Sequence, residues 1–220
     1  MHIVPNLITV QDLSPGYLIN DDYRNLTFND VKHSELLELP VDLSIQKARR
    51  PHYLYLKLKK AGTNDDLSLL RLKKIVIHND TYYSVDKSNS FIKGKGYAQY
   101  LYEYSFIYLK YPVISDKTQT MPGSAKLWKK FHENQNSKHY TLYIINENTY
   151  TISPYINRNF NDYDIWGWHP DFINLLRTYP EMLEDGLKDG DLSEELYHYL
   201  NDGWNKVKDR AHIRLIGRKK

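Results

Sequence analysis

The stretch that most constrains the fold is a short glycine loop, residues 91–98, which opens directly onto a segment with helical spacing. Gly94 and Gly96 allow positive φ angles and leave room for a ligand close to the backbone. At the start of a helix, unpaired N–H groups and the positive end of the dipole both favour phosphate. The pattern therefore fits a phosphate-binding loop, and it also fits an ordinary glycine turn. Side chains recurring at three- and four-residue steps define the face of the expected helix: Ala98, Leu101, Ser105, Tyr108 and Leu109.

The residues before the loop predict an antiparallel meander. Leucine alternates with tyrosine and lysine over residues 52–59, which is typical of a half-buried strand. Two further strands are expected over residues 69–77 and 81–85. After the expected helix we predict a strand at 111–115, a helix at 124–132, a hairpin of 140–145 with 149–152, and a strand at 211–216.

The two ends of the chain carry weaker signals. A short strand is expected near residues 7–10, and a helix over Asn29–Leu39 that Pro40 ends. Toward the C-terminus we expect helices near 170–178, 180–187 and 193–204, with an aromatic wedge at Trp166–Pro170. We therefore expect a domain over residues 1–155 and a helical extension, 156–220, packed on it.

Composition narrows the classes of protein and partner. The chain has 220 residues, 41% of them apolar and 26% charged, which indicates a globular protein. It has no cysteine, so disulfides and thiolate metal sites are excluded. No apolar run is long enough to span a membrane and no secretory signal is visible, so we expect a cytoplasmic protein without a membrane partner. Its 20 tyrosines reflect either coding bias or a surface that stacks on bases.

Two segments together resemble a known family. Lys93-Gly-Lys-Gly-Tyr-Ala98 is similar to the acetyl-CoA loop of the GNAT family of N-acetyltransferases, Arg/Gln-x-x-Gly-x-Gly/Ala. The segment Ser115–Phe131, with its Ser-Asp, Gln, small-residue turn and Leu-Trp, resembles a phage-encoded branch of that family. The resemblance covers residues 91–131 well and residues 53–152 more weakly.

The resemblance implies an α/β (α+β) fold, with a mixed central sheet of GNAT type and helices on both faces. Two central parallel strands would splay apart, with the pantetheine arm of an acyl-CoA in the gap and its pyrophosphate on the loop. The phage setting would place the protein in the host cytoplasm. The residues implied to hold acetyl-CoA, or another acyl-CoA, are Lys93, Gly94, Lys95, Gly96, Tyr97, Ala98 and Ser124.

The implied reaction, attack of an amine on a thioester, needs a base and oxyanion donors. His78 and Asp86 lie near the strand before the loop, although a His-Asn-Asp sequence is also a common turn. Ser115 and Asp116 lie at the C-terminal end of the expected central parallel strand, where sites collect in α/β sheets, and Asp116 could instead brace the next loop. Gln119 belongs to the same group of candidate residues. The histidines show no metal-ligand spacing, so we expect no metal.

One residue departs from the family pattern. Trp128 stands where the family has a tyrosine that protonates the leaving thiolate, and an indole N–H donates a hydrogen bond but is not an acid near neutral pH. The leading hypothesis is acyl-CoA-dependent N-acyl transfer to an unknown amine. One alternative is a catalytically silent phage protein of this fold that binds a host protein or nucleic acid. The other is a nucleic-acid base modifier of the phage Mom type.

Overall fold

The computed structural model describes residues 8–9, 23, 25–32, 35–92, 94–116, 120–121, 123–155, 181–198, 201 and 213–220. The chain forms two compact units. The larger comprises residues 13–116, 127–155 and 214–220, and the smaller comprises 1–12, 117–126 and 156–213. Within the described ranges, no helix combines the length and apolar character needed to cross a membrane.

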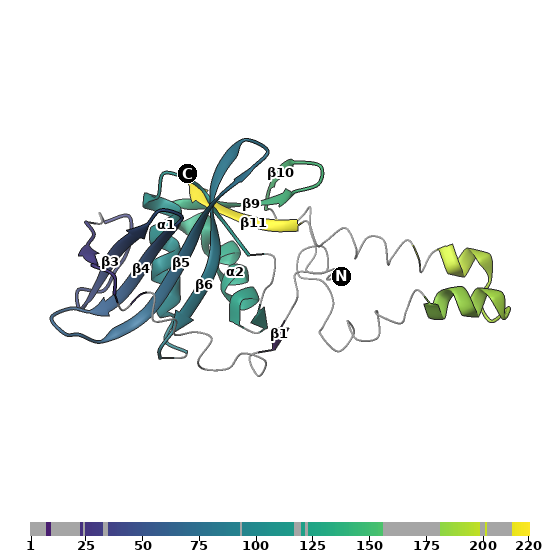
Figure 1. The fold of residues 1–220 in the computed structure, drawn as a ribbon, viewed down its shortest axis with the longest axis horizontal. Coiled ribbons are helices and arrows are strands. Elements are labelled where there is room, and N and C mark those ends of the chain that lie inside the picture. Colours follow the sequence, from purple (N-terminus) through teal and green to yellow (C-terminus); the bar gives the residue numbers. More distant parts are fainter. Residues whose placement is uncertain are drawn as a thin grey trace. The chain divides into compact units, whose positions relative to one another are not determined.

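The larger unit is built on a mixed sheet of nine strands in the order β10-β9-β11-β7-β6-β5-β4-β3-β2 (Figure 1). From β2 to β6 neighbouring strands are antiparallel, whereas β6 and β7 are parallel. The strands are β2 Asn29–Asp30, β3 Leu43–Arg50, β4 Tyr53–Lys60, β5 Asp66–Ile77, β6 Asp80–Ser90, β7 Val113–Ile114, β9 Tyr140–Asn146, β10 Thr151–Pro154 and β11 Ile213–Lys219. The large mixed sheet with a few helices confirms the α+β class.

Alternation in the sequence sets the core face of the sheet. Leu54 and Leu56 on β4 are 1% and 0% exposed and lie opposite Leu72 and Leu70 on β5. Cross-strand partners share a face, so these leucines form a continuous apolar surface. The expected strands of the meander are confirmed: β4 is shifted by one residue from 52–59, and β5 and β6 extend beyond the expected 69–77 and 81–85.

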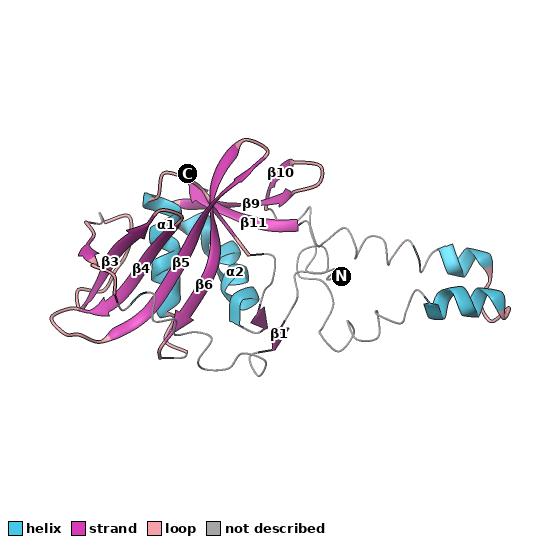
Figure 2. Ribbon diagram, viewed as in Figure 1, coloured by secondary structure: helices cyan, strands magenta, loops and turns pink. Residues whose placement is uncertain are grey.

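Two helices, α1 (Tyr97–Tyr108) and α2 (Gly123–Asn134), cover this face (Figure 2). Phe106 of α1 lies 5.1 Å from Phe131 of α2 and 5.2 Å from Tyr140 of β9, measured between ring centroids. Phe131 also contacts Tyr140, so both helices pack on the face that carries this tyrosine. The sequence led us to expect helices on both faces. Among the described residues α1 and α2 share one, because their aromatic side chains form a single core.

The opposite face carries a second apolar cluster. Its buried members come from four neighbouring strands, and Tyr150 of the β9–β10 turn packs against them. This cluster lies where parallel β7 joins the sheet and gives the sheet apolar support on both sides. Its buried members are Tyr82, Ile114, Ile145 and Ile216.

One expectation near the N-terminus is corrected. The helix predicted over Asn29–Leu39 is wrong: Asn29 and Asp30 form β2, and the described residues 35–40 are turns and extended chain that bury Leu37. Pairing with β3 draws Asn29 and Asp30 into the sheet, so tertiary pairing overrides the local helix signal. Strand β3 itself was not predicted, because its second half is rich in cations.

The smaller unit contains the parallel pair β1 (Ile8–Thr9) and β8 (Thr120–Met121) and helical segments at 181–188 and 194–198. The Ser193 hydroxyl accepts a hydrogen bond from the Leu196 N–H at 3.2 Å and caps the second segment. The wedge expected at Trp166–Pro170 and the helix expected near 170–178 lie outside the described residues. The sequence-based division at residue 155 did not anticipate that the chain returns as β11 to the middle of the large sheet.

We predict that Gly217→Ala destabilises the larger unit by about 1–3 kcal/mol. A Cβ on Gly217 of β11 would lie 2.4 Å from the Phe106 ring, which the aromatic core holds in place. Urea unfolding followed by circular dichroism measures the loss. Combining the change with Phe106→Leu should give less than the sum of the two single losses, and strict additivity would contradict the clash.

Candidate functional site

The candidate site lies where parallel strands β6 and β7 part. They pair only at Tyr83 with Val113 and at Ser84 with Ile114. Strand β6 then continues to Ser90, whereas β7 has already ended. A bulge at Asp86 interrupts the pairing of β6 with β5 at this point, since Arg71 pairs with Lys87 and the next residue of β5 pairs with Val85. Bulges bend a strand and redirect side chains.

The part of β6 beyond the bulge directs backbone donors toward the side that β7 has left. The Phe91 N–H donates to the Leu67 carbonyl across the β5 side at 3.0 Å. Because successive residues of a strand direct their N–H groups to opposite sides, those of Ser88 and Ser90 are directed to the β7 side. An extended ligand with carbonyl groups could pair with this edge.

The glycine loop follows at the end of β6. Gly94 and Gly96 have φ of 78° and 73°, and a Cβ at either would meet nothing within 4 Å. Positive φ, and not lack of space, therefore requires glycine here. Gly96 is the N-cap of α1, and the first turn carries no acidic side chain. Tyr97 and Ala98 open the helix, Lys95 is exposed, and Lys93 lies outside the described residues.

Two carboxylates stand at the point where the strands part. Asp86 accepts a hydrogen bond from the Arg71 guanidinium, which forms an ion pair with it. Burial raises the pKa of Asp116 to about 7; the positive charge of Arg214 opposes this rise, and the charge of Asp86 adds to it. Asp116 is thus poised to exchange a proton near neutral pH.

Arg214 of β11 ties three strands and a turn together beneath Asp116. Its side chain is 4% exposed. It donates to the Ser115 carbonyl at 2.5 Å, the Ser84 hydroxyl at 2.7 Å and the Glu147 carboxylate at 2.8 Å. Burial lowers the pKa of Arg214 and Glu147 raises it, and a guanidinium stays charged near neutral pH. Arg214 therefore supplies a fixed positive charge to the site.

Ser115 is buried and its hydroxyl is engaged by the backbone. It donates to the Asp116 carbonyl at 3.1 Å and accepts from the Leu215 N–H at 3.1 Å. These bonds hold the chain as it leaves β7 and orient the residue that follows. The geometry suits Ser115 to positioning Asp116.

The structure brings together Asp86, Ser115 and Asp116, whereas His78 lies in the β5–β6 turn with a φ of 45°. Its Nε2 lies 3.1 Å from the Glu147 carbonyl oxygen, and its ring packs on Tyr150. His78 is linked to the carboxylate cluster through Glu147, whose side chain pairs with Arg214. Ser124 lies in the first turn of α2, in the smaller unit, and Gln119 is outside the described residues.

Sequence reasoning missed two residues of the site, Arg214 and Tyr102. A lone arginine inside the apolar run Ile213-Arg-Leu-Ile216 is the signal that could have identified the first. Tyr102 of α1 is buried. Burial raises its pKa and the charge of Asp116 raises it further, while a hydrogen bond with the Ser88 side chain lowers it. No comparable sequence signal marks Tyr102, because its helix contains several other tyrosines.

Trp128 of α2 is fully buried against the aromatic side chains of α1. It packs edge-on against Tyr102, with ring centroids 5.9 Å apart. Its Nε1–H is buried and has no hydrogen-bond partner. An orphaned buried donor costs roughly 1–3 kcal/mol, so its presence marks a place where a ligand acceptor would be favoured.

A pocket of about 620 Å³ adjoins the glycine loop and includes Ile92 and Tyr97 in its lining. Lys60 lines it too, but three carboxylates, Asp42, Asp65 and Asp66, make its walls acidic. Such a pocket suits a neutral or cationic group better than a phosphate. Across the described ranges, no three histidine or acidic side chains converge as a metal site would need.

We predict that Arg214→Met destabilises the protein by about 3–5 kcal/mol, because it leaves Glu147 without its guanidinium partner and removes the link between β11, β6 and β7. Chemical unfolding measures the change. Arg218→Met, on the same strand but exposed, is the matched control and should cost less than about 1 kcal/mol. Equal losses would contradict a central role for Arg214.

We predict that Asp116→Asn stabilises the protein at pH 8 by about 2 kcal/mol more than at pH 4. The pKa of Asp116 is raised in the folded state, so its contribution to stability is intact in acid and is lost as pH rises through about 7. Asparagine does not ionise and escapes that loss. Melting temperatures of both proteins between pH 4 and 8 test this, and a pH-independent difference would refute it.

No protein-family model, curated protein or solved structure matches this chain. A function must therefore be inferred from the site itself: the parted strands, the glycine loop and the carboxylate–arginine cluster.

Proposed function

We propose that this protein is an acyl-CoA-dependent N-acyltransferase with a GNAT-type fold, acting on an amine. The observation that carries the proposal is the parting of β6 and β7 immediately before the glycine loop. The resemblance of residues 91–131 to that family implies such a gap as the seat of the pantetheine arm. The phage-encoded branch is part of the same proposal and rests on Ser115–Phe131 alone.

The chain offers donors along the length that such a cofactor needs. The N–H groups of Ser88 and Ser90 would pair with the amide carbonyls of the pantetheine arm. The N–H groups that begin α1, after Gly94 and Gly96, would hold the pyrophosphate, with Lys95 nearby in sequence. When bound, the cofactor supplies an acyl thioester that an amine can attack.

Asp116 is the proposed base. An amine arrives largely protonated, and a carboxylate with a pKa near 7 can accept that proton at neutral pH. The buried Arg214 fixes the backbone before Asp116 and keeps part of its population ionised. Asp86, held by Arg71, would attract the cationic amine to the same place.

Trp128 favours a second candidate, a catalytically silent protein of the same fold that binds a host protein or nucleic acid. Its indole N–H can donate to a carbonyl or thiolate but cannot protonate one. Tyr102 lies beside it, yet its raised pKa makes it a weak acid. The base-modifier hypothesis draws no specific support from the site.

We predict that acetyl-CoA binds and raises the melting temperature, and that Gly96→Ala weakens binding about ten-fold. Alanine at a φ of 73° costs roughly 1–2 kcal/mol, which would distort the loop. Isothermal titration calorimetry measures the two affinities, and thermal unfolding followed by circular dichroism measures the shift in melting temperature. Gly190→Ala, at a φ of 79° in the smaller unit, is the matched control and should leave affinity unchanged.

No heat and no thermal shift at millimolar acetyl-CoA would refute the cofactor proposal. Binding without thiol release across a panel of primary amines would favour the silent binder over the enzyme.

A further inference from the structure

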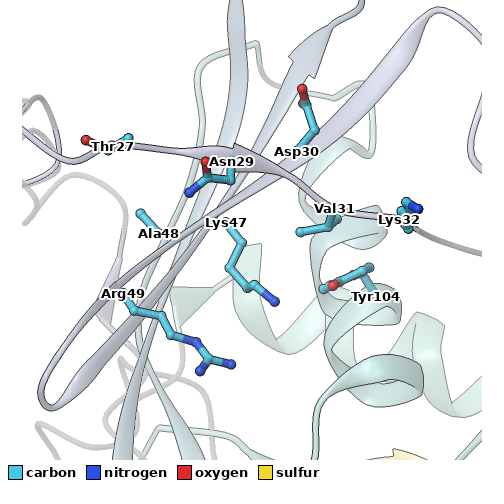
Figure 3. Close-up of a pocket in the computed structure, with 9 residues that line it drawn as sticks. All are labelled: Thr27, Asn29, Asp30, Val31, Lys32, Lys47, Ala48, Arg49 and Tyr104. Carbon is cyan, nitrogen blue, oxygen red and sulfur yellow. The ribbon is translucent and has the colours of Figure 1, made fainter.

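A second polar pocket, of about 500 Å³, lies at the far edge of the sheet, between β2, β3 and α1 (Figure 3). Its lining includes Lys32, Lys47 and Arg49 together with Tyr104 of α1. None of these residues belongs to the glycine loop or to the carboxylate cluster around Asp116. The pocket is therefore separate from the site of the proposed function.

The pocket has cations on the face of the sheet that elsewhere forms the core. Lys47 and Arg49 of β3 lie opposite Leu56 and Leu54 of β4. These two leucines are 0% and 1% exposed. Cross-strand partners share a face, so these two cations are on the apolar side, the side α1 covers. Figure 3 shows both side chains extending to the same side of β3, toward Tyr104. Lys47 is half-buried and Arg49 is exposed, so water reaches both charges and an anion could take its place.

These cations are not neutralised by the protein. Elsewhere Lys57 pairs with Asp66 and Arg71 with Asp86. Within the described part of the chain no carboxylate forms an ion pair with Lys47 or Arg49. Asp30 also lines the pocket, but its carboxylate accepts a hydrogen bond from Gln46 and is directed away from the cations in Figure 3.

Tyr104 gives the pocket a rigid hydrogen-bond donor. It is 4% exposed and stacks on Tyr108 with ring centroids 5.1 Å apart. Burial raises the pKa of Tyr104, the charge of Tyr108 raises it further and Arg49 lowers it, so the phenol stays protonated. A neutral phenol beside a guanidinium and an ammonium donates hydrogen bonds and offers no competing negative charge.

We propose that this pocket binds the phosphate group of a phosphate ester, either a free nucleotide or the backbone of a nucleic-acid strand. Arg49 supplies a planar fork of donors that matches two phosphate oxygens, and Lys47 supplies a compact charge. The Tyr104 hydroxyl and the Asn29 amide complete the set of donors. The pocket is open and polar, which suits a hydrated anion and disfavours an apolar ligand.

The test is calorimetric titration of the whole protein with tripolyphosphate, ADP and a twelve-residue oligothymidylate. At least one should bind with a dissociation constant below about 1 mM, and Lys47→Gln with Arg49→Gln should weaken it at least ten-fold. Lys73→Gln combined with Lys59→Gln is the matched control. It removes the same charge from β4 and β5 outside the pocket lining and should change affinity less than two-fold.

Binding must also survive Gly96→Ala, which separates this pocket from the glycine loop and from the proposed function. Tighter binding of ADP than of tripolyphosphate, with no gain from the oligonucleotide, identifies a nucleotide. Tighter oligonucleotide binding with a steeper salt dependence identifies a strand. No binding of any probe, or equal losses in the pocket and control variants, overturns the proposal.

Discussion

The buried guanidinium of Arg214 is the interaction on which the rest of the larger unit depends. It binds the Ser115 carbonyl, the Ser84 hydroxyl and the Glu147 carboxylate, and so joins segments that are 67 to 130 residues away from it in sequence. Removing such a charge from water is costly, and only this full set of partners offsets the cost. The same contacts fix where β7 ends, and with it the position of Asp116. Stability and the proposed chemistry are thus coupled through one side chain.

A second constraint acts from the helix side. The aromatic side chains of α1 and α2 meet those of β9, and Gly217 of β11 lets the Phe106 ring approach the sheet closely. This packing holds α1 in place directly after the glycine loop, so the loop is anchored at one end by β6 and at the other by a rigid helix. Trp128 belongs to this core, yet its N–H lacks a partner. The core therefore contributes both rigidity and one polar atom that faces no acceptor.

Much of the order of elements could be predicted, because alternation over β4 and helical spacing after the glycines are local properties. Asp86, Ser115 and Asp116 could be proposed because they follow or interrupt strands at recognisable places. Strand β3 and its pocket could not be predicted, because Lys47 and Arg49 interrupt the apolar alternation of the strand. Only the pairing with β4 shows that these two residues share a face with Leu56 and Leu54. The helix expected over Asn29–Leu39 failed for the complementary reason: β3 offered Asn29 and Asp30 strand partners, and tertiary pairing overrode the local preference.

By itself the sequence determined the strands of the meander, the helix after the glycines, where the glycine turns lie, and that Ser115 and Asp116 come at the end of β7, because periodicity and positive φ are read locally. Only the tertiary structure decided that β11 enters between β7 and β9, that Arg214 sits beneath Asp116, and that burial moves the pKa of that carboxyl to about 7. The physical reason is range: desolvation and charge pairing depend on groups far away in sequence, and no local pattern records which of them will meet.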